Sequence, residues 1–134
     1  MVSALSLNSK ILEDVQPIRN LFTDRTVSNI KLLYRASDNG FSIKEFHKQC
    51  DHIPHTFALI RTEFDKIIGG YTPVEWTSAK KHWVADKSLQ SFIFSLNMKE
   101  KFRLNLAQFA IASNPDRGPT FGCCDICIVE NSNK

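Results

Sequence analysis

Short runs of apolar residues recur along most of the chain, which is typical of β-strands joined by tight connections. The runs at 56–62 and 66–72 flank a polar tip at 63–65 and predict a β-hairpin. Further strands are expected at 30–34, 91–96, 108–112 and 126–129. Because strands and helices do not alternate regularly, we expect a mixed α and β chain with mainly antiparallel pairing.

Helical spacing is found in two places. At 9–22 the apolar residues fall on one face, with Ser9 as a cap and Pro17 expected to kink or split the helix. Further on, Ser42 and Glu45 match a capping box, in which each side chain accepts a hydrogen bond from the other residue's backbone N–H. One face of this second helix is expected to hold Ile43, Phe46, His47 and Cys50.

Three local signals refine the strands and their connections. The residues at 57–60 are apolar without alternation, so this strand is expected to be covered on both faces. Gly69 and Gly70 lie inside the next strand and indicate a bulge or a close backbone approach. The Asp-Asn-Gly sequence at 38–40 predicts a turn, and we interpret His82 and Trp83 as part of a loop.

Composition and charge exclude several classes of protein. The chain has 134 residues, of which 43% are hydrophobic and 23% are charged, as in an ordinary single globular domain. A net charge of +3 with one adjacent basic pair, Lys80-Lys81, does not predict a nucleic-acid surface. No run approaches the roughly 20 apolar residues that span a bilayer, so membrane insertion is not expected. The first residues lack the features of a signal peptide, so we expect the chain in the cytoplasm or the nucleus.

The cysteines offer the first candidate chemistry. Cys123, Cys124 and Cys127 lie within five residues, a spacing that does not predict a disulfide framework. If the residues up to 129 form one extended strand, the side chains of Cys124 and Cys127 point to opposite faces of it, and their Cα atoms lie about 10 Å apart. Cysteines that only pack, redox-active thiols and a metal knuckle all stay open as interpretations of this cluster.

Other catalytic or metal-binding patterns are weak. The segment 47–55 holds three histidines, a cysteine and an aspartate, but no second ligand pair at zinc-finger spacing. We therefore favour structural roles for these side chains and keep a zinc site as an alternative. Motifs of hydrolases, metalloproteases, nucleotide-binding loops and dinucleotide-binding folds are missing from the sequence, so we assign no catalytic residue, cofactor or metal. Arg35 and Asp38 are expected to pair across their turn.

Several motifs together resemble the TLDc domain family. The segment 32–42, Leu-Leu-Tyr-Arg-Ala-Ser-Asp-Asn-Gly-Phe-Ser, resembles the family's opening L-Y-x-x-S-x-D-G-F-S motif. The segments 67–72 with Trp76, and 91–96, resemble the F-G-G-Y and S-F-L-F-S-L motifs. The segment 118–128 resembles G-P-x-F-G-G-G-x-D-L-x-I, with cysteines where that motif has glycines. Such a turn must change its conformation or carry strain.

The resemblance implies an α+β fold, an antiparallel two-sheet β-sandwich flanked by short helices. It further implies a single domain over 1–134, with an N-terminal helical segment at 1–29 and a sandwich core at 30–130. TLDc domains normally continue with further strands, so we expect the core to be C-terminally incomplete, without its closing strands. Architectural roles are expected for Gly40, Gly69, Gly70, Trp76 and Gly118.

The function implied by the resemblance is that of a non-enzymatic protein-interaction domain. The family is linked to oxidative-stress resistance and to regulation of the vacuolar proton pump (V-ATPase), whose subunits are the expected protein partners. Our prediction for the partner-binding surface is Arg35, Asp38, Glu75 and Trp76. The alternative is a thiol-based antioxidant or weak enzymatic activity that uses Cys123, Cys124 and Cys127.

Overall fold

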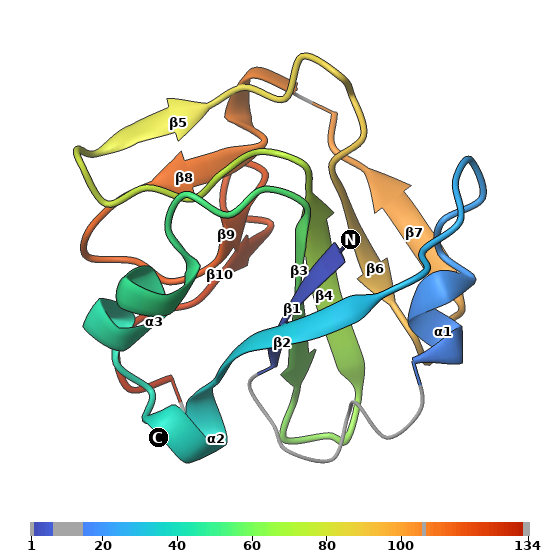
Figure 1. Cartoon of the computed structure of the whole chain (residues 1–134), viewed down its shortest axis with the longest axis horizontal. Helices are drawn as coiled ribbons and strands as arrows, with labels where there is room; N and C mark the ends of the chain where they lie inside the picture. Colours follow the sequence, from blue (N-terminus) through green and yellow to red (C-terminus); the bar gives the residue numbers. More distant parts are fainter. Residues whose placement is uncertain (1, 7–14, 106, 133–134) are drawn as a thin grey trace.

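Two β-sheets pack against each other in the computed structural model of the chain, which describes residues 2–6 by their backbone and residues 15–105 and 107–132 (Figure 1). Within these ranges the larger sheet has six strands in the order β2-β1-β3-β4-β6-β7. The smaller sheet has, over the same ranges, four strands in the order β10-β9-β8-β5. The two-sheet α+β architecture predicted from the sequence is confirmed.

The larger sheet consists of β1 (Val2–Ser6), β2 (Ile30–Arg35), β3 (Thr56–Arg61), β4 (Ile67–Thr72), β6 (Phe92–Ser95) and β7 (Glu100–Arg103). The smaller sheet consists of β5 (His82–Val84), β8 (Ile111–Ser113), β9 (Thr120–Phe121) and β10 (Ile126–Cys127). The helices are α1 (Gln16–Arg19), α2 (Ala36–Asn39), α3 (Ile43–Cys50) and the 3-10 turn η2 (Ala107–Phe109). Pairing is antiparallel except at β1, which runs parallel to both β2 and β3.

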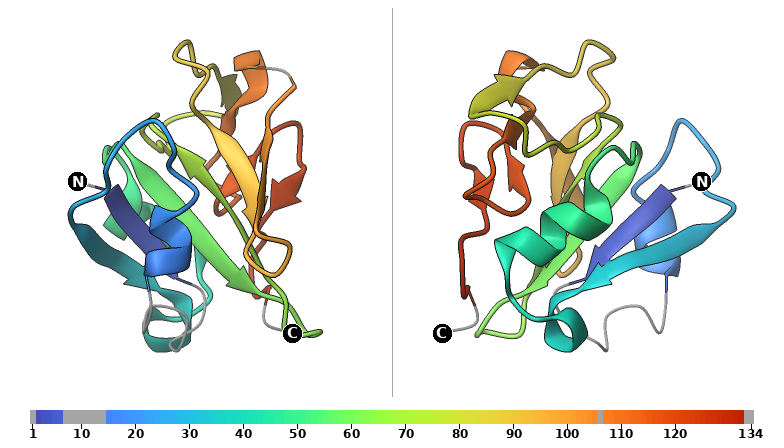
Figure 2. Two further views of the ribbon diagram at one scale, coloured as in Figure 1. Left: turned by 90° about the vertical axis from the view of Figure 1, so that its right-hand side faces the viewer. Right: turned by 60° about the vertical axis from the view of Figure 1, so that its left-hand side comes forward.

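The larger sheet is covered on both faces at its central strand β3. On one face, Phe57 and Leu59 of β3 join a core cluster with Ile18 of α1. On the other face, Ala58 joins a cluster with Phe46 of α3 and with residues of the smaller sheet. Figure 2 shows α1 and α3 on opposite sides of this sheet. The expectation that this strand is covered on both faces is confirmed.

The two adjacent glycines of β4 permit close packing on both faces. A Cβ at Gly70 would lie 2.6 Å from ring atoms of Phe121, which belongs to the smaller sheet. A Cβ at Gly69 would lie 1.9 Å from the carbonyl oxygen of Ala58. Because β3 and β4 pair without a shift of register, the glycines mark a close approach and not a bulge.

The first helix differs from its prediction. Part of the predicted range 9–22 lies outside the described residues, and α1 begins at Gln16. Pro17 lies in the first turn of α1, where a missing N–H costs little and the fixed φ suits the helix. Pro17 therefore lies at the start of a helix and not inside one, and the predicted kink or split of a helix over 9–22 stays a prediction because 7–14 lie outside the described residues. The segment 1–29, expected to be helical, contains the strand β1 in addition to α1.

The helix α3 begins and packs as predicted, but its N-terminus is capped from elsewhere. Its four expected core residues are all buried. Ser42 has the extended conformation of an N-cap, yet its side chain makes no capping hydrogen bond. The backbone N–H of Ile43 donates to Oε2 of Glu130 at 2.9 Å, across 87 residues of chain. The predicted capping box is wrong, because the Ser42 side chain makes no capping hydrogen bond and the carboxylate that caps this end comes from Glu130, on the N–H of Ile43.

The remaining differences concern short elements. The residues 38–40 do form a turn, as one helical turn, α2, that ends at Gly40 with φ of +89°. The strands β1, β5, β7 and β9 were not predicted, and the expected loop at His82 and Trp83 is wrong because both residues belong to β5. Trp83 pairs with Ala112 of β8. The expected lack of closing strands stays a prediction.

Candidate functional site

The first half of the predicted partner surface is a polar corner at the end of β2. Nη1 of Arg35 lies 3.4 Å from Oδ2 of Asp38, which belongs to α2. The Asp38 side chain is 58% exposed and the Arg35 side chain 22% exposed. The backbone N–H of Arg35 also donates a hydrogen bond to Oδ1 of Asn39, at 3.1 Å. The predicted pairing across the turn is present, and its exposed carboxylate is accessible to a partner.

The second half of that surface separates into one exposed and one buried residue. Glu75 is 54% exposed at its side chain and lies 3.9 Å from Nδ1 of His52. Trp76 is 0% exposed, and its Nε1 donates to Oγ1 of Thr56 at 2.8 Å. Its ring meets those of Phe46 and Phe121 edge to face. Trp76 therefore belongs to the core, and the prediction that it contacts a partner is corrected.

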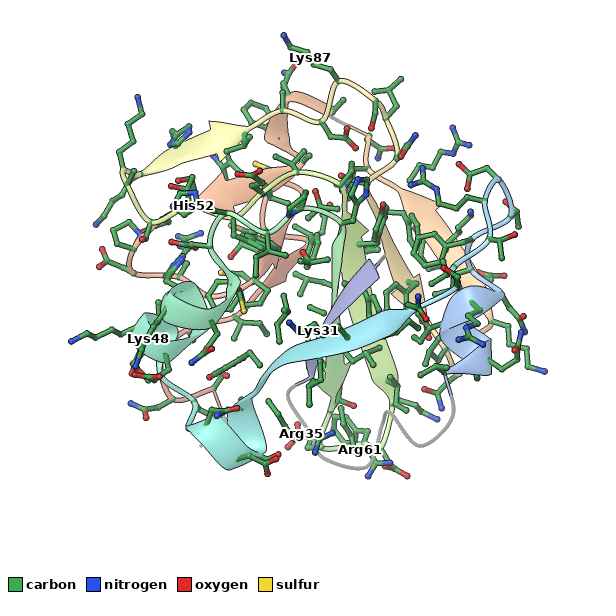
Figure 3. All side chains as sticks on the ribbon, viewed as in Figure 1. Lys31, Arg35, Lys48, His52, Arg61 and Lys87 are labelled. Carbon is green, nitrogen blue, oxygen red and sulfur yellow. The ribbon has the colours of Figure 1, made fainter. Side chains whose placement is uncertain are left out.

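The structure does not bring the two halves together. Figure 3 shows Arg35 and His52, the neighbour of Glu75, in widely separated parts of the molecule. Arg35 lies where β2 meets α2, whereas Glu75 lies in the loop after β4. The sequence prediction therefore describes two separate exposed polar patches, one around Arg35 and Asp38 and one around Glu75.

Two of the three C-terminal cysteines, Cys124 and Cys127, interact with the guanidinium of Arg117. Cys123 and Cys124 are exposed, and Cys127 is half-buried in β10. Nη1 of Arg117 lies 3.0 Å from Sγ of Cys124, at hydrogen-bond distance. This hydrogen bond, followed by the charges of Cys127 and Cys124, raises the pKa of Arg117. Guanidinium groups are typical neighbours of reactive cysteines, because they stabilise the thiolate that reacts with oxidants. Sequence reasoning did not select Arg117.

The backbone at these cysteines differs from the extended strand assumed from the sequence. Cys124 lies in the turn before β10, so it does not share a strand with Cys127. Its φ is +70°, a left-handed conformation that glycine adopts more readily. The strain expected from a cysteine in a glycine position is therefore present here. Cys50 contrasts with the cluster, since burial and then the charge of Asp51 raise its pKa far above the usual range.

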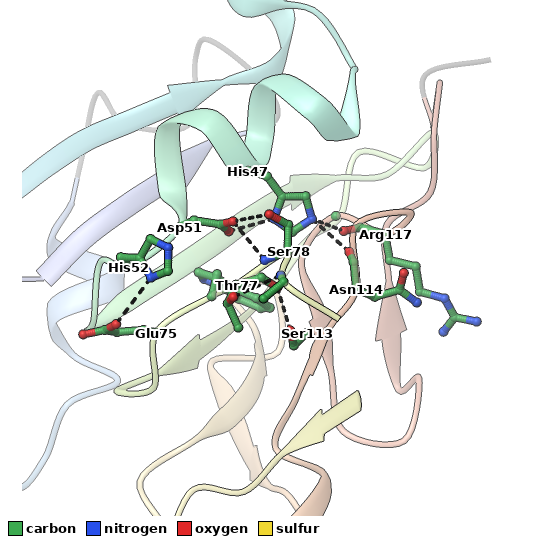
Figure 4. A network of polar contacts seen from close by, with 12 residues as sticks. His47, Asp51, His52, Glu75, Thr77, Ser78, Ser113, Asn114 and Arg117 are labelled. Atoms are coloured by element: carbon green, nitrogen blue, oxygen red, sulfur yellow. Dashed lines mark hydrogen bonds and ion pairs between the residues drawn. The ribbon is translucent and has the colours of Figure 1, made fainter. Parts of the chain in front are cut away.

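The histidine-rich segment forms a polar network that joins α3 to two loops (Figure 4). Nδ1 of His47 lies 2.7 Å from Oδ1 of Asp51, and Nε2 lies 2.9 Å and 3.0 Å from the carbonyl oxygens of Asn114 and Arg117. Oδ2 of Asp51 accepts hydrogen bonds from the N–H and the hydroxyl of Ser78. Both ring nitrogens and both carboxylate oxygens are thus engaged within the fold. The network holds α3 against the loops and offers no free group to a substrate.

The three histidines of this segment face three different partners. His47 contacts Asp51, His52 faces Glu75, and Nδ1 of His55 lies 2.9 Å from the hydroxyl of Tyr71. In the part of the chain that the structure describes, no group of three or more His, Cys, Asp or Glu side chains is arranged to hold a metal ion. The geometry does not support the zinc alternative.

A buried carboxylate that sequence reasoning missed organises the loop before β6. Asp86 is 2% exposed and accepts five hydrogen bonds from the N–H and hydroxyl of Ser88, the N–H of Gln90, and the N–H and hydroxyl of Ser91. Burial alone would raise the pKa of Asp86, but the hydrogen bonds from Ser88 and Ser91 lower it below its usual value. The Asp-x-Ser spacing of a side-chain-stabilised turn was the available signal.

A comparison with known protein families shows which family this chain is related to. The sequence profile described as the TLDc domain matches residues 5–134. The chain belongs to the TLDc domain family. No curated protein and no solved structure shows a significant match to the chain. The resemblance drawn from separate motifs is thereby confirmed over nearly the whole sequence.

The glycines of the TLDc motifs lie at places where the backbone needs them. Gly40 has a positive φ, and its carbonyl accepts a hydrogen bond from the Tyr34 hydroxyl. A Cβ at Gly118 would lie 3.3 Å from side-chain atoms of Ile128, which is tight. These contacts are structural and do not form a reactive site. Among the described residues, no helix is long and apolar enough to cross a membrane.

Proposed function

We propose that this TLDc domain is a non-enzymatic protein-interaction module that acts in the cytoplasm or nucleus, in oxidative-stress resistance and in regulation of the vacuolar proton pump. The observation that carries the proposal is the family match over residues 5–134. The polar networks are consistent with a non-enzymatic role, because the His47–Asp51 pair and Asp86 are engaged by the fold itself. The pump subunits are the proposed partners.

The docking surface proposed for this partner is one of the two exposed polar patches. Asp38 at the end of β2 and Glu75 after β4 present side chains that are 58% and 54% exposed. An exposed carboxylate with a weak surface ion pair is readily drawn to a cationic group on a partner, because little is lost when the existing pair opens.

Capture of purified pump subunits by the purified full chain tests the proposal. We expect binding at micromolar concentration, and about tenfold weaker binding when charge is reversed at the patch that docks, by Asp38→Lys or Glu75→Lys. Lys87→Glu is the matched control, since Lys87 is exposed and lies in neither patch. Absence of capture contradicts the proposed function, whereas capture unaffected by both reversals contradicts only the proposed surface.

A thiol-based antioxidant activity is a second candidate, favoured by the 3.0 Å contact between Arg117 and Cys124. In this reaction the Cys124 thiolate attacks one oxygen of hydrogen peroxide and the O–O bond breaks. The sulfur becomes a sulfenic acid and, with a proton, the other oxygen leaves as water. The sulfur loses two electrons, and the peroxide gains them.

Peroxide consumption by the purified chain tests this second candidate. We expect it to fall in Cys124→Ser and, through loss of the guanidinium, in Arg117→Ala. Cys50→Ser is the control, because the Cys50 side chain is fully buried. Consumption that is unchanged after Cys123, Cys124 and Cys127 are all replaced by serine would exclude the activity.

A further inference from the structure

A cleft beside the larger sheet, whose lining includes neither the two polar patches nor the cysteine cluster, gathers cationic side chains from distant parts of the chain. Its walls are the connection from α1 to β2, the loop before β6, and the faces of β4, β6 and β7. The cavity volume is about 340 Å³, within the range of small-molecule sites. A second hollow of about 230 Å³ adjoins it and shares Leu89, Ser91 and Arg103 with it.

Positive charge dominates the lining of the cleft. Arg25, Lys101 and Arg103 contribute three cations, and Asp24 is the one acidic residue among the residues described as lining it. Asp24 lies 3.6 Å from Arg25, but its side chain is 62% exposed, so water screens much of that pairing. The cleft is therefore suited to an anion.

The cation from Arg25 is held in place by a chain of hydrogen bonds. Its Nη1 donates to the hydroxyl of Tyr71 at 3.3 Å, and its Nη2 donates to the side-chain oxygen of Gln90. The Tyr71 hydroxyl lies 2.9 Å from Nδ1 of His55 and can donate to it. Burial, and then the positive charge of Arg25, lower the pKa of His55, which fits an imidazole that accepts this bond. Because Tyr71 is 1% exposed, the guanidinium is fixed by the core.

The two cations of β7 project from the same face of the sheet, since they are two residues apart. Nζ of Lys101 donates to the carbonyl oxygen of Leu21 at 2.8 Å and lies 5.1 Å from the centroid of the Phe92 ring. Arg103 is exposed and lines both hollows, and its guanidinium has no hydrogen bond or ion pair to any residue of the described ranges. Its guanidinium is thus available to a ligand.

Apolar groups complete the cleft. Phe22 and Phe92 form aromatic walls whose ring centroids lie 5.5 Å apart. Leu89 is 62% exposed at the rim, an uncommon position for a large apolar side chain next to cations. Arginines pair with phosphate through two parallel hydrogen bonds, which a carboxylate matches in geometry but with less charge. The combination fits an ester that carries phosphate at one end and an apolar group at the other.

We propose that this cleft binds a soluble phosphate monoester, with the phosphate between Arg25, Lys101 and Arg103 and the apolar group against Phe22 and Leu89. Isothermal titration of the full chain with phenyl phosphate, inorganic phosphate and phosphatidic acid vesicles tests it. We expect saturable binding of one phenyl phosphate per chain, and weaker binding of inorganic phosphate because it lacks the ring.

Variants of Arg103 decide whether binding occurs in this cleft. Arg103→Ala is expected to weaken phenyl phosphate binding at least about tenfold, since a hydrogen bond to a charged group contributes that much. Arg103→Lys keeps the positive charge but loses the two parallel N–H donors of the guanidinium. Its affinity for phenyl phosphate should lie between those of the wild type and Arg103→Ala. Lys87→Ala, a control in the same loop as Leu89, should bind like the wild type.

Three results would overturn the proposal. The first is that phenyl phosphate shows no saturable binding, whether or not the phosphatidic acid vesicles bind. A second is binding that Arg103→Ala leaves unchanged. The third is equal weakening by Lys87→Ala, which would mean that the ester is attracted by net charge and not held by the cleft.

Discussion

The buried carboxylate of Asp86 is the most informative place to perturb this domain. It ties together the loop that precedes β6, through five hydrogen bonds at 2.5–2.9 Å from Ser88, Gln90 and Ser91. The substitution Asp86→Asn keeps the shape of the side chain. It removes the charge and replaces one accepting oxygen by an amide group that can only donate.

The magnitude follows from those five bonds. If the remaining oxygen faces Gln90 and Ser91, three bonds survive and each loses about 1 kcal/mol when its acceptor becomes neutral. The amide then faces the backbone N–H of Ser88, and a part-buried donor left without an acceptor costs about 1–3 kcal/mol. Because a neutral amide costs less free energy to bury than a carboxylate, about 2 kcal/mol of this loss is offset. We expect a net loss of about 3 kcal/mol in the free energy of unfolding.

Urea unfolding followed by tryptophan fluorescence measures this loss, because Trp76 is fully buried in the folded state. Asp65→Asn is the matched control, since the Asp65 side chain is 81% exposed at a hairpin tip and has a left-handed φ that asparagine tolerates. A loss below about 1 kcal/mol for Asp86→Asn, or a similar loss for the control, would refute the reasoning.

The same residue predicts a pH dependence. Because the folded-state pKa of Asp86 lies below its unfolded value, its contribution to stability is complete above the unfolded pKa, about 3.9. That contribution is lost as pH falls through the folded pKa. The difference in stability between wild type and Asp86→Asn should therefore narrow below about pH 4. A difference that stays constant from pH 7 down to about pH 2 contradicts the lowered pKa.

Four further substitutions test the packing, each by urea unfolding. Glu130→Ala should cost about 1 kcal/mol by uncapping α3, whereas Ser42→Ala should cost less than about 0.5, and the reverse order would contradict the distant cap. Gly70→Ala should cost about 1–3 kcal/mol, because its Cβ would lie 2.6 Å from the Phe121 ring; a neutral result would show that the sheets can separate freely. Trp76→Phe should cost about 2 kcal/mol through a cavity and a lost hydrogen bond, and a smaller cost than about 0.5 would place the indole outside the core.

The parts of the fold that local pattern predicts are those whose burial is strongest. The hairpin of β3 and β4 and the strand β6 are apolar on the faces they bury, so their positions are readable from the sequence. The missed strand β7, Glu-Lys-Phe-Arg, lies at the edge of its sheet with three of its four residues exposed. Edge strands are commonly charged, and a charged strand resembles a loop in its composition.

Distant contacts explain why some local signals gave wrong predictions. Ser42 and Glu45 have the right spacing for a capping box, but the Ser42 side chain makes no capping hydrogen bond, and Oε2 of Glu130 caps the helix at the N–H of Ile43. Likewise, Trp76 beside Glu75 suggested an exposed aromatic, whereas Thr56 and two aromatic rings enclose the indole. In both cases the deciding partner lies at least 20 residues away in the chain.

The proposed cleft depends on contacts of the same long range. In the sequence, Arg25 is one polar residue in the connection between two elements. Arg103 belongs to β7, a strand whose charged composition resembles that of a loop. Only the order β4-β6-β7 and the anchoring of Arg25 on Tyr71, 46 residues away, bring their charges to one cavity. Local spacing identifies a site when its groups share one helix or one strand. A cationic cleft assembled across a sheet has no such spacing, so it becomes visible only once the strands are paired.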